Sequence, residues 1–309
     1  MIIFLTGASG LVGSAYARAA TRRGHHVVGV VGTYAGKVEG LSETVTVDLT
    51  DLDALTSALL DAFPEAIVNC AAMASPEACE ADPARAQVLN VALPAQLALL
   101  ARHVSARLVH LSSEQVFDGA QTAPYRIGDA PAPIHLYGRQ KLESERVVHA
   151  KASENAVTVR APLLMGNSLA GQRSTHERLF LDWAAVRAPR LFTDEFRQTC
   201  SAENLAEVML ELSEREDVRG VMHWAGAELI SRYALGERIR EHFKLTEQQA
   251  PLVAVSRQEI PAVARRRQAC LALDLTPLAG KLKTRPQTME EQLEELKVPL
   301  PCREWYLKL

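Results

Sequence analysis

The chain has 309 residues, of which 48% are hydrophobic and 23% charged, and its 34 Lys and Arg residues stand against 37 Asp and Glu, for a formal charge of −3. These values exclude collagen-like, coiled-coil and largely disordered chains. The lack of a basic excess argues against a nucleic-acid binder. No apolar run reaches the roughly 18 residues that span a bilayer, so we expect no integral membrane protein.

The N-terminal segment and the cysteines indicate the cellular compartment in which we expect the protein. The segment 1–10 has no basic region before its apolar run and leads directly into glycines, so it is predicted to be a strand and not a signal peptide. The odd number of cysteines and the lack of a C-x-x-C pair favour free thiols over disulfides or zinc. We therefore expect a cytoplasmic protein without a metal site; its cysteines are Cys70, Cys79, Cys200, Cys270 and Cys302.

The first half alternates short apolar runs with helix-like segments, which predicts an α/β fold with a doubly wound parallel sheet. Thr50 is the expected N-cap of the second helix, and Pro94 predicts a kink or break in the third. The expected strands are 2–6, 27–31, 44–49, 66–71, 107–112 and 156–164, and the expected helices are 11–23, 51–63, 83–103 and 136–150.

The second half is less regular and predicts a smaller α/β lobe. Ser201 and Ser231 are the expected caps of helices that end near residues 215 and 243. A strand is expected at 220–225 and a final acidic helix at 289–297. We expect residues 1–165 to form the nucleotide-binding domain and residues 166–309 the smaller substrate-binding lobe, with parts of the chain crossing back to the first domain.

A glycine-rich loop joins the first strand to the first helix, in the order Thr-Gly-Ala-Ser-Gly-Leu-Val-Gly. Gly7 permits a tight turn, Gly10 lets the backbone approach a pyrophosphate, and Gly13 lets the helix pack closely on the strand. The pyrophosphate would lie on the free N–H groups at the start of the helix. The alternative is an ordinary tight turn between a strand and a helix. The predicted cofactor-binding residues of this loop are Gly7, Ser9, Gly10, Leu11, Val12 and Gly13.

A tyrosine and a lysine stand four residues apart on the predicted helix 136–150. Residues i and i+4 share one face, so Tyr137 and Lys141 can point into one cleft. A lysine cation stabilises a phenolate and so lowers the tyrosine pKa. Ser112 and Ser113 end the preceding strand, where ligands bind in open α/β sheets. A serine there can hydrogen-bond a carbonyl oxygen that the tyrosine protonates. The alternative is a solvated helix face.

Together, these motifs resemble the extended short-chain dehydrogenase/reductases, which have a Rossmann-type fold. The segments 69–72, 112–119, 137–142 and 192–205 resemble the dTDP-4-dehydrorhamnose reductase branch of that family. The similarity extends from residue 1 to about residue 296. The segments 220–226 and 265–274 are most similar to a relative in the same branch, the regulatory beta subunit of methionine adenosyltransferase.

The resemblance implies roles for individual residues. Ser113 would polarise the substrate carbonyl, Tyr137 would donate the proton, and Lys141 would assist it and bind the cofactor ribose. Asn90 corresponds to a helix asparagine of the family, and a structural hydrogen bond is an equally good interpretation. The remaining residues implied in cofactor binding lie at the ends of the third and fourth expected strands and are Asp48, Leu49, Cys70, Ala71 and Ala72.

The predicted substrate pocket departs from the family pattern. The reductases often carry aromatic residues where this chain has Met73, Gln115 and Leu163, and Glu114 replaces the usual aspartate. These differences leave the identity of the sugar substrate open, more than the type of reaction. Arg266 lies in a triplet, 265–267, that we expect to help bind an anionic substrate, the alternative being a solvated run of charge.

The end of the second strand bears on the choice of cofactor. A ribose-binding Asp or Glu is expected near residues 32–34, but the chain has Gly-Thr-Tyr there and no carboxylate before Glu39. Thr33 and Lys37 could accommodate a 2′-phosphate, although Lys37 could equally be a solvated loop residue. The sequence therefore favours NADP(H) over NAD(H).

The leading hypothesis is an NAD(P)H-dependent reductase of a nucleotide-activated 4-keto-6-deoxy sugar, resembling dTDP-4-dehydrorhamnose reductase. The alternative is a non-catalytic, NADP-binding regulatory subunit that acts on a partner enzyme such as a methionine adenosyltransferase. The expected ligand is a small nucleotide sugar, with no nucleic acid or membrane partner, and a homodimer is the assembly considered.

Overall fold

A computed structural model describes residues 1–309, except for the side chains of Pro261 and Val263. Its centre is a seven-stranded sheet in the order β11-β6-β5-β4-β1-β2-β3, in which every pair of neighbours is parallel. The strand order reverses direction between β1 and β4, which is where doubly wound sheets bind ligands. The strands are β1 (Ile2–Thr6), β2 (His26–Val31), β3 (Glu43–Thr46), β4 (Ala66–Asn69), β5 (Arg107–Ser113), β6 (Ala156–Ala161) and β11 (Gly220–His223).

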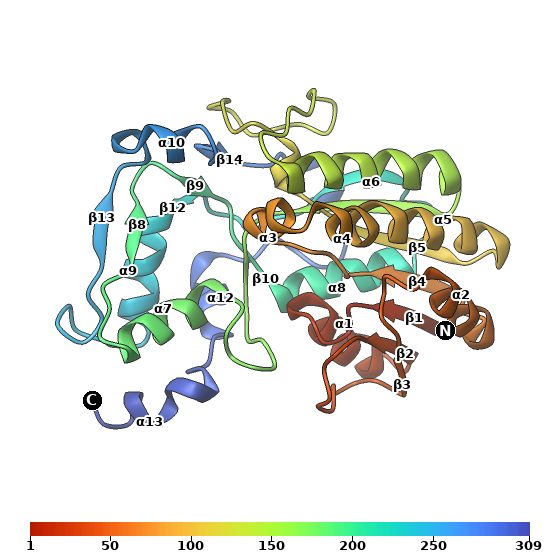
Figure 1. Ribbon diagram of the computed structural model, residues 1–309, viewed down its shortest axis with the longest axis horizontal. Coiled ribbons are helices and arrows are strands. Elements are labelled where there is room, and N and C mark those ends of the chain that lie inside the picture. The colour runs from red at the N-terminus through yellow and green to blue at the C-terminus, as the bar shows by residue number, and fades with distance from the viewer.

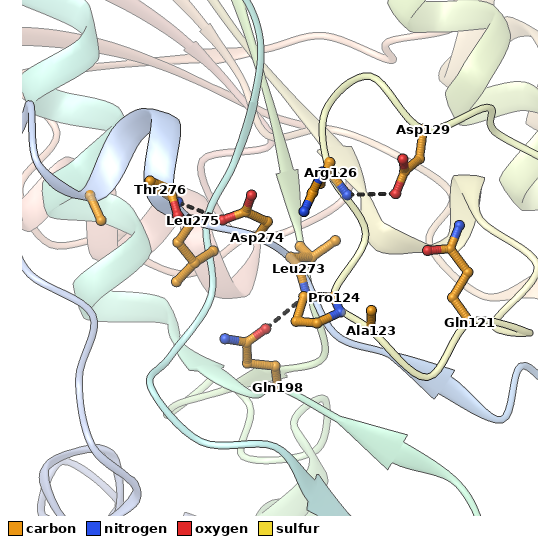
Figure 2. Close-up of a pocket in the computed structure, with 11 residues that line it drawn as sticks. Gln121, Ala123, Pro124, Arg126, Asp129, Gln198, Leu273, Asp274, Leu275 and Thr276 are labelled. Atoms are coloured by element: carbon orange, nitrogen blue, oxygen red, sulfur yellow. Dashed lines mark hydrogen bonds between the residues drawn. The ribbon is translucent and has the colours of Figure 1, made fainter.

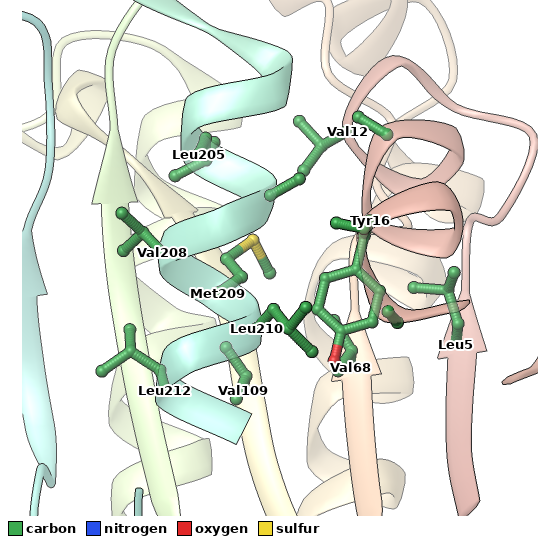
Figure 3. Close-up of a cluster of buried hydrophobic side chains, with 14 of the residues drawn as sticks. Leu5, Val12, Tyr16, Val68, Val109, Leu205, Val208, Met209, Leu210 and Leu212 are labelled. Atoms are coloured by element: carbon green, nitrogen blue, oxygen red, sulfur yellow. The ribbon is translucent and has the colours of Figure 1, made fainter. Parts of the chain in front are cut away.

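Helices cover both faces of this sheet (Figure 1). One face packs on α1 (Leu11–Arg22) and α8 (Ala202–Ser213), and the other on α2 (Leu52–Ala62), α5 (Leu93–His103) and α6 (Leu136–Ala152). In Figure 3, α8 lies beside α1, with Met209 and Leu210 facing Tyr16 between the two helices. The Tyr16 hydroxyl lies 2.8 Å from the Ser213 hydroxyl inside this core. The predicted doubly wound parallel sheet is therefore confirmed.

Most of the expected elements of the first half are present, with two shifts near residue 50. The second helix has Asp51 as its N-cap, and the Asp51 carboxylate accepts a hydrogen bond from the N–H of Ala54 at 3.0 Å. The prediction of Thr50 as the cap is thus wrong, because Thr50 instead donates to Asp48. The third strand ends at Thr46, so Asp48 and Leu49 lie in the turn that follows it.

The third predicted helix is interrupted, as the position of Pro94 indicates. The segment comprises α4 (Pro83–Gln87), a π-helical turn η1 (Val88–Ala92) and α5, with Pro94 in the first turn of α5.

The same segment contradicts the expectation that no run of the chain is long and apolar enough to span a bilayer. The run 83–103 has a mean hydropathy of 1.2, and half of its most apolar window is buried in the molecule, as in the core helix of a globular protein.

The second lobe lies at the other end of the molecule, with the C-terminus (Figure 1). Its core joins residues of α7 (Thr175–Ala184), α9 (Arg232–His242) and α12 (Met289–Glu294). Ser201 and Ser231 cap α8 and α9 as predicted, and α7 was not predicted. The remaining elements are α3 (Pro76–Ala81), η2 (Glu114–Val116), β7 (Leu164–Met165), β8 (Arg190–Phe192), β9 (Phe196–Arg197), β10 (Cys200–Ser201), β12 (Ile230–Ser231), β13 (Val253–Val255), η3 (Arg257–Glu259), α10 (Pro261–Ala264), β14 (Cys270–Leu271), α11 (Thr276–Ala279), η4 (Leu300–Cys302) and α13 (Arg303–Tyr306).

The chain crosses between the two lobes more than once. After β7 it enters the second lobe and returns through β10 to α8 and β11, which complete the helix layer and the edge of the large sheet. Residues after Ala225 then return to the second lobe through β12 and α9. The large core therefore contains residues from both halves of the sequence.

A buried histidine in the second lobe makes stability depend on pH. His176 is fully buried, its Nε2 lies 3.2 Å from the carbonyl of Lys297, and its Nδ1 lies 2.9 Å from the Ser174 hydroxyl. Burial lowers the pKa of His176 to about 4. The unfolded chain binds this proton below a pH of about 6.5, so the folded state loses about 2 kcal/mol of stability between pH 7 and pH 5.

We expect His176→Gln to remove that share of the acid sensitivity, because glutamine does not titrate. Urea unfolding at pH 7 and pH 5 measures it, and the difference between the two pH values should shrink by about 2 kcal/mol relative to wild type. His149→Gln is the control, because His149 is exposed on α6. An equal shrinkage in both variants would contradict the assignment to His176.

Candidate active site

The glycine loop forms a cradle at the switch point of the sheet. Gly7 has φ +70, and a Cβ there would lie 2.7 Å from the backbone nitrogen of Ala71, two residues after the end of β4. A Cβ on Gly13 would collide with the carbonyl of Gly7, so α1 can approach the loop only with glycine at that position. The turn and the close packing predicted for these two glycines are thus present.

The first turn of α1 has the properties of an anion site. Gly10 is its N-cap, no side chain caps the helix, and no acidic residue lies in its first turn. A Cβ on Gly10 would meet only the carbonyl oxygen of Gly7, at 3.0 Å, within 4 Å. Free N–H groups and the positive end of the helix dipole suit a pyrophosphate. The loop therefore fits a dinucleotide, while the roles of Ser9, Leu11 and Val12 stay predictions.

The other predicted cofactor residues follow neighbouring strands at the same edge of the sheet. Thr33 and Lys37 are exposed in the loop after β2. Asp48 is also exposed, and its carboxylate accepts hydrogen bonds from the N–H and hydroxyl of Thr50, which lowers its pKa. Leu49 follows it in the turn after β3, and Cys70, Ala71 and Ala72 follow β4. Their roles in binding stay predictions.

The predicted serine and tyrosine meet at the end of β5. Ser113 is the last residue of the strand and Tyr137 lies in the first turn of α6, and both are 7% exposed. Burial raises the pKa of Tyr137 to about 12, and the neighbouring Ser113 side chain opposes part of this rise. The phenol is therefore protonated at neutral pH and available as a donor. The expectation of a lowered tyrosine pKa is wrong for this environment, because desolvation dominates.

Lys141 lies one turn further along α6 and is 1% exposed. Its Nζ donates a hydrogen bond of 2.6 Å to the carbonyl of Leu111 on β5. Burial lowers the pKa of Lys141 to about 8, opposed by the nearby Glu145 carboxylate. The ammonium is thus largely protonated at pH 7, in a fixed position beside the strand that carries Ser113.

Two of the four predicted substrate residues, Met73 and Gln115, contact the first turn of α6, and Leu163 packs against the core of the second lobe. Met73 packs with Tyr137, the carbonyl of Gln115 lies against Gly138 in the first turn of α6, and Leu163 follows β6. Arg266 is exposed on the segment between α10 and β14. The next residue, Arg267, forms an ion pair instead, as described below.

Asn90 has a structural role in the loop beside Tyr137. Its Oδ1 accepts the N–H of Met73 at 2.9 Å, and its Nδ2 donates to the carbonyl of Met73 at 3.2 Å and to Gln140 at 2.9 Å. These contacts fix the main chain after β4 to α6. Of the two interpretations of Asn90, the structure favours a structural hydrogen bond.

A buried ionic cluster next to Ser113 was not predicted. Glu114 is 1% exposed, and its Oε1 lies 3.4 Å from Nε of Arg197 on β9. Burial raises the pKa of Glu114 to about 8, opposed by Arg197. Glu195 pairs with Arg197 at 3.3 Å and with Arg267 at 2.6 and 3.0 Å. These pairs connect the two lobes, and only their charges were visible in the sequence.

His135 and Gly138 were also missed. His135 caps α6 by accepting the N–H of Gly138 at 3.0 Å, and its ring stacks near that of Tyr137. A side chain on Gly138 would collide with the carbonyl of Gln115, so glycine is required for the contact of α6 with η2. A His before a Tyr-Gly pair at a helix start was the signal available in the sequence.

A separate hollow of about 590 Å³ lies between the loop after β5 and the segment before α11 (Figure 2). Arg126, Asp129, Gln198 and Asp274 are among its lining residues. None of the predicted catalytic, cofactor or substrate residues lines it. Among the residues whose side chains are described, no three His, Cys, Asp or Glu are grouped as metal ligands.

Comparison with known proteins agrees with this geometry. The RmlD substrate binding domain family matches residues 1–299. The chain belongs to this family. A probable low-salt glycan biosynthesis reductase, Agl14 of Haloferax volcanii, is 31% identical over 96% of this chain and 97% of its own. Methionine adenosyltransferase 2 subunit beta of Xenopus laevis is 31% identical over 78% of this chain and 72% of its own.

A solved structure of this fold extends the comparison. The hypothetical dTDP-4-dehydrorhamnose reductase from Sulfolobus tokodaii is 27% identical, with a TM-score of 0.81 over 96% of this chain and 100% of that one. The resemblance stated from the motifs is thus confirmed for the fold and the family. Membership of the RmlD family, together with this site, indicates an enzyme of the nicotinamide-dependent reductase and epimerase type.

Proposed function

We propose that this RmlD family member is an NAD(P)H-dependent reductase of a nucleotide-activated 4-keto-6-deoxy sugar. The observation that carries the proposal is that Ser113 at the end of β5 neighbours Tyr137 and Lys141 on α6, with the Lys141 ammonium held on the carbonyl of Leu111. The glycine cradle lies at the same edge of the sheet, after β1. The reductase names of the two relatives that match almost the whole chain support the same reaction class.

In this proposal, each residue of the site has a separate role in the reaction. NAD(P)H, when bound, supplies a hydride to a carbonyl carbon. Tyr137 is protonated at neutral pH, so its hydroxyl delivers the proton to the developing alkoxide. Ser113 donates a hydrogen bond to the same oxygen. Lys141 holds a positive charge in the buried wall of the site, and its proposed second role is to bind the cofactor ribose.

A direct assay tests this proposal. The purified protein is mixed with NADPH and a panel of dTDP-linked 4-keto-6-deoxy sugars, and the loss of nicotinamide absorbance is followed. Turnover with at least one of them, dependent on enzyme concentration, is expected. Absence of turnover with every sugar, in a protein that binds NADPH, would contradict the proposal.

A second candidate function is a cofactor-binding regulatory subunit. It is favoured by the likeness to methionine adenosyltransferase 2 subunit beta over 78% of this chain. In that case, no sugar is reduced, and the protein changes the rate of a methionine adenosyltransferase in a mixture of the two. The unbroken set of Ser113, Tyr137 and Lys141 favours the enzyme.

For the cofactor, we propose NADPH over NADH because no carboxylate occupies residues 32–38 after β2. Lys37→Ala should weaken NADPH binding about 3- to 10-fold and leave NADH binding unchanged, because in this proposal the exposed ammonium would contact only the 2′-phosphate. Titration by protein fluorescence measures both constants. Lys308→Ala, an exposed charge near the C-terminus, is the matched control. Tighter binding of NADH by the wild type would overturn the preference.

A further inference from the structure

One row of buried polar side chains crosses the sheet beneath the site. Thr6, Asn69 and His110 lie on neighbouring strands in register, β1 with β4 and β4 with β5. Each is at most 1% exposed. Thr6 immediately precedes the glycine loop, and His110 lies three residues before Ser113. The row therefore connects the strand of the cofactor loop to the strand of the catalytic serine.

The donor and the acceptor of each hydrogen bond in this row can be assigned. Oδ1 of Asn69 accepts from the hydroxyl of Thr6 at 2.7 Å and from the N–H of Ala71 at 3.1 Å. The Asn69 Nδ2 must then donate, and it lies 3.1 Å from Nδ1 of His110. His110 consequently carries its proton on Nε2.

The row continues into the catalytic helix. Nε2 of His110 lies 3.0 Å from the hydroxyl of Ser144, which donates to the carbonyl of Lys141 at 2.6 Å. The next residue of β5, Leu111, accepts the Lys141 ammonium at 2.6 Å. Two consecutive residues of β5 therefore fix Lys141. His110 holds its main chain through Ser144, and the carbonyl of Leu111 holds its side chain.

Neutral His110 suits this arrangement. Its ring accepts at one nitrogen and donates at the other, and a second proton would remove the acceptor that Asn69 needs. Burial and the nearby Lys141 ammonium lower the pKa of His110 well below its usual value. The ring is therefore a fixed two-ended connector in the interior and lies outside the reacting centre.

We infer that His110 is a positioning residue, which sets the turn of α6 that carries Tyr137 and Lys141 relative to the glycine loop. This inference rests on the proposed function for its catalytic consequence. Its structural part is the chain of hydrogen bonds from Thr6 to Lys141, which an apolar side chain at position 110 would break. A displacement of catalytic groups by a fraction of an ångström is sufficient to slow a reaction.

The experiment compares three variants. His110→Leu removes both hydrogen bonds and leaves Asn69 and Ser144 without their partner. His110→Gln keeps one donor and one acceptor on a side chain that is long enough to reach Asn69 and Ser144. Thr158→Val is the control, because Thr158 is the register neighbour of His110 on β6, is 4% exposed, and lies outside this chain of bonds. All are measured for NADPH affinity, for kcat per NADPH-binding site, and for KM of the keto sugar.

For His110→Leu, kcat per binding site should fall about 10-fold while the sugar KM changes less than about 2-fold. His110→Gln should recover most of kcat, and Thr158→Val should resemble wild type. Equal losses in His110→Leu and Thr158→Val, or no recovery by glutamine, would overturn the inference, because a loss of packing alone predicts both.

The outcome is separable from that of the proposed function. If the wild type reduces no sugar, the proposed function fails, and the positioning of Lys141 is then measured by NADPH affinity alone, which should fall about 3-fold or more in His110→Leu and recover in His110→Gln. Wild-type turnover with unchanged kcat and NADPH affinity in His110→Leu would overturn the inference and leave the proposed function intact.

Discussion

Tyr137→Phe is expected to lower kcat about 10²- to 10⁴-fold with little change in NADPH affinity. The ring would keep its packing with Met73 and its stacking near His135, while the hydroxyl beside Ser113 is lost. The hydride could still be aligned, but the alkoxide would have no positioned proton donor. Stopped-flow measurement of NADPH oxidation, with cofactor titration in parallel, gives both quantities.

Ser113→Ala is the matched comparison for this prediction. It removes one hydrogen bond to the developing charge but no proton, so its loss of kcat should be smaller than that of Tyr137→Phe. Equal activity of Tyr137→Phe and wild type would exclude the tyrosine as the acid. A wild type that reduces no sugar but binds NADPH normally in both variants would support the regulatory alternative.

Gly10→Val is expected to weaken NADPH binding about 100-fold or more. A branched side chain at the N-cap of α1 would occupy the space over the free N–H groups, which would otherwise donate to a phosphate. The loss of two such hydrogen bonds, each worth about 1.5 kcal/mol or more, would correspond to about 100-fold. The fold should persist, because only the Gly7 carbonyl oxygen lies within 4 Å of a Cβ at this position. Calorimetric titration measures the affinity, and circular dichroism checks the fold.

The control for this loop variant is Gly128→Val. A Cβ there would meet nothing within 4 Å, and its φ lies outside the left-handed region, so valine should be tolerated and NADPH affinity retained. Unchanged affinity in a folded Gly10→Val protein would mean that the loop does not bind the phosphates. The cofactor assignment would then need another site.

Local sequence patterns predicted the large sheet well, and the second lobe poorly. The apolar run 27–31 is buried at every position, so its composition alone indicates a parallel strand that is covered on both faces. The strands of the second lobe have two or three residues, which is too short for a periodic signal. α7 was missed because its capping box at Ser174 and Glu177 was not recognised as a helix start.

The parts of the site that lie close together in the sequence could be predicted, because a single motif contains several of its residues. Tyr137 and Lys141 share a helix, and Ser113 ends the strand before it. Contacts between distant segments were not predictable, as with Glu114 and Arg197, which are 83 residues apart and meet only when β9 folds against η2. The pKa of Tyr137 is a similar case, since burial and not sequence spacing decides it.

The return of the chain to the large sheet has a consequence for biosynthesis. α8 supplies Leu205, Met209 and Leu210 to the core against α1, and β11 pairs with β6 along its whole length. A nascent chain that has emerged only to residue 165 lacks this layer and leaves the side of α1 that faces α8 uncovered. About 225 residues must therefore leave the ribosome before the nucleotide-binding half can close, and its apolar surface stays exposed until then.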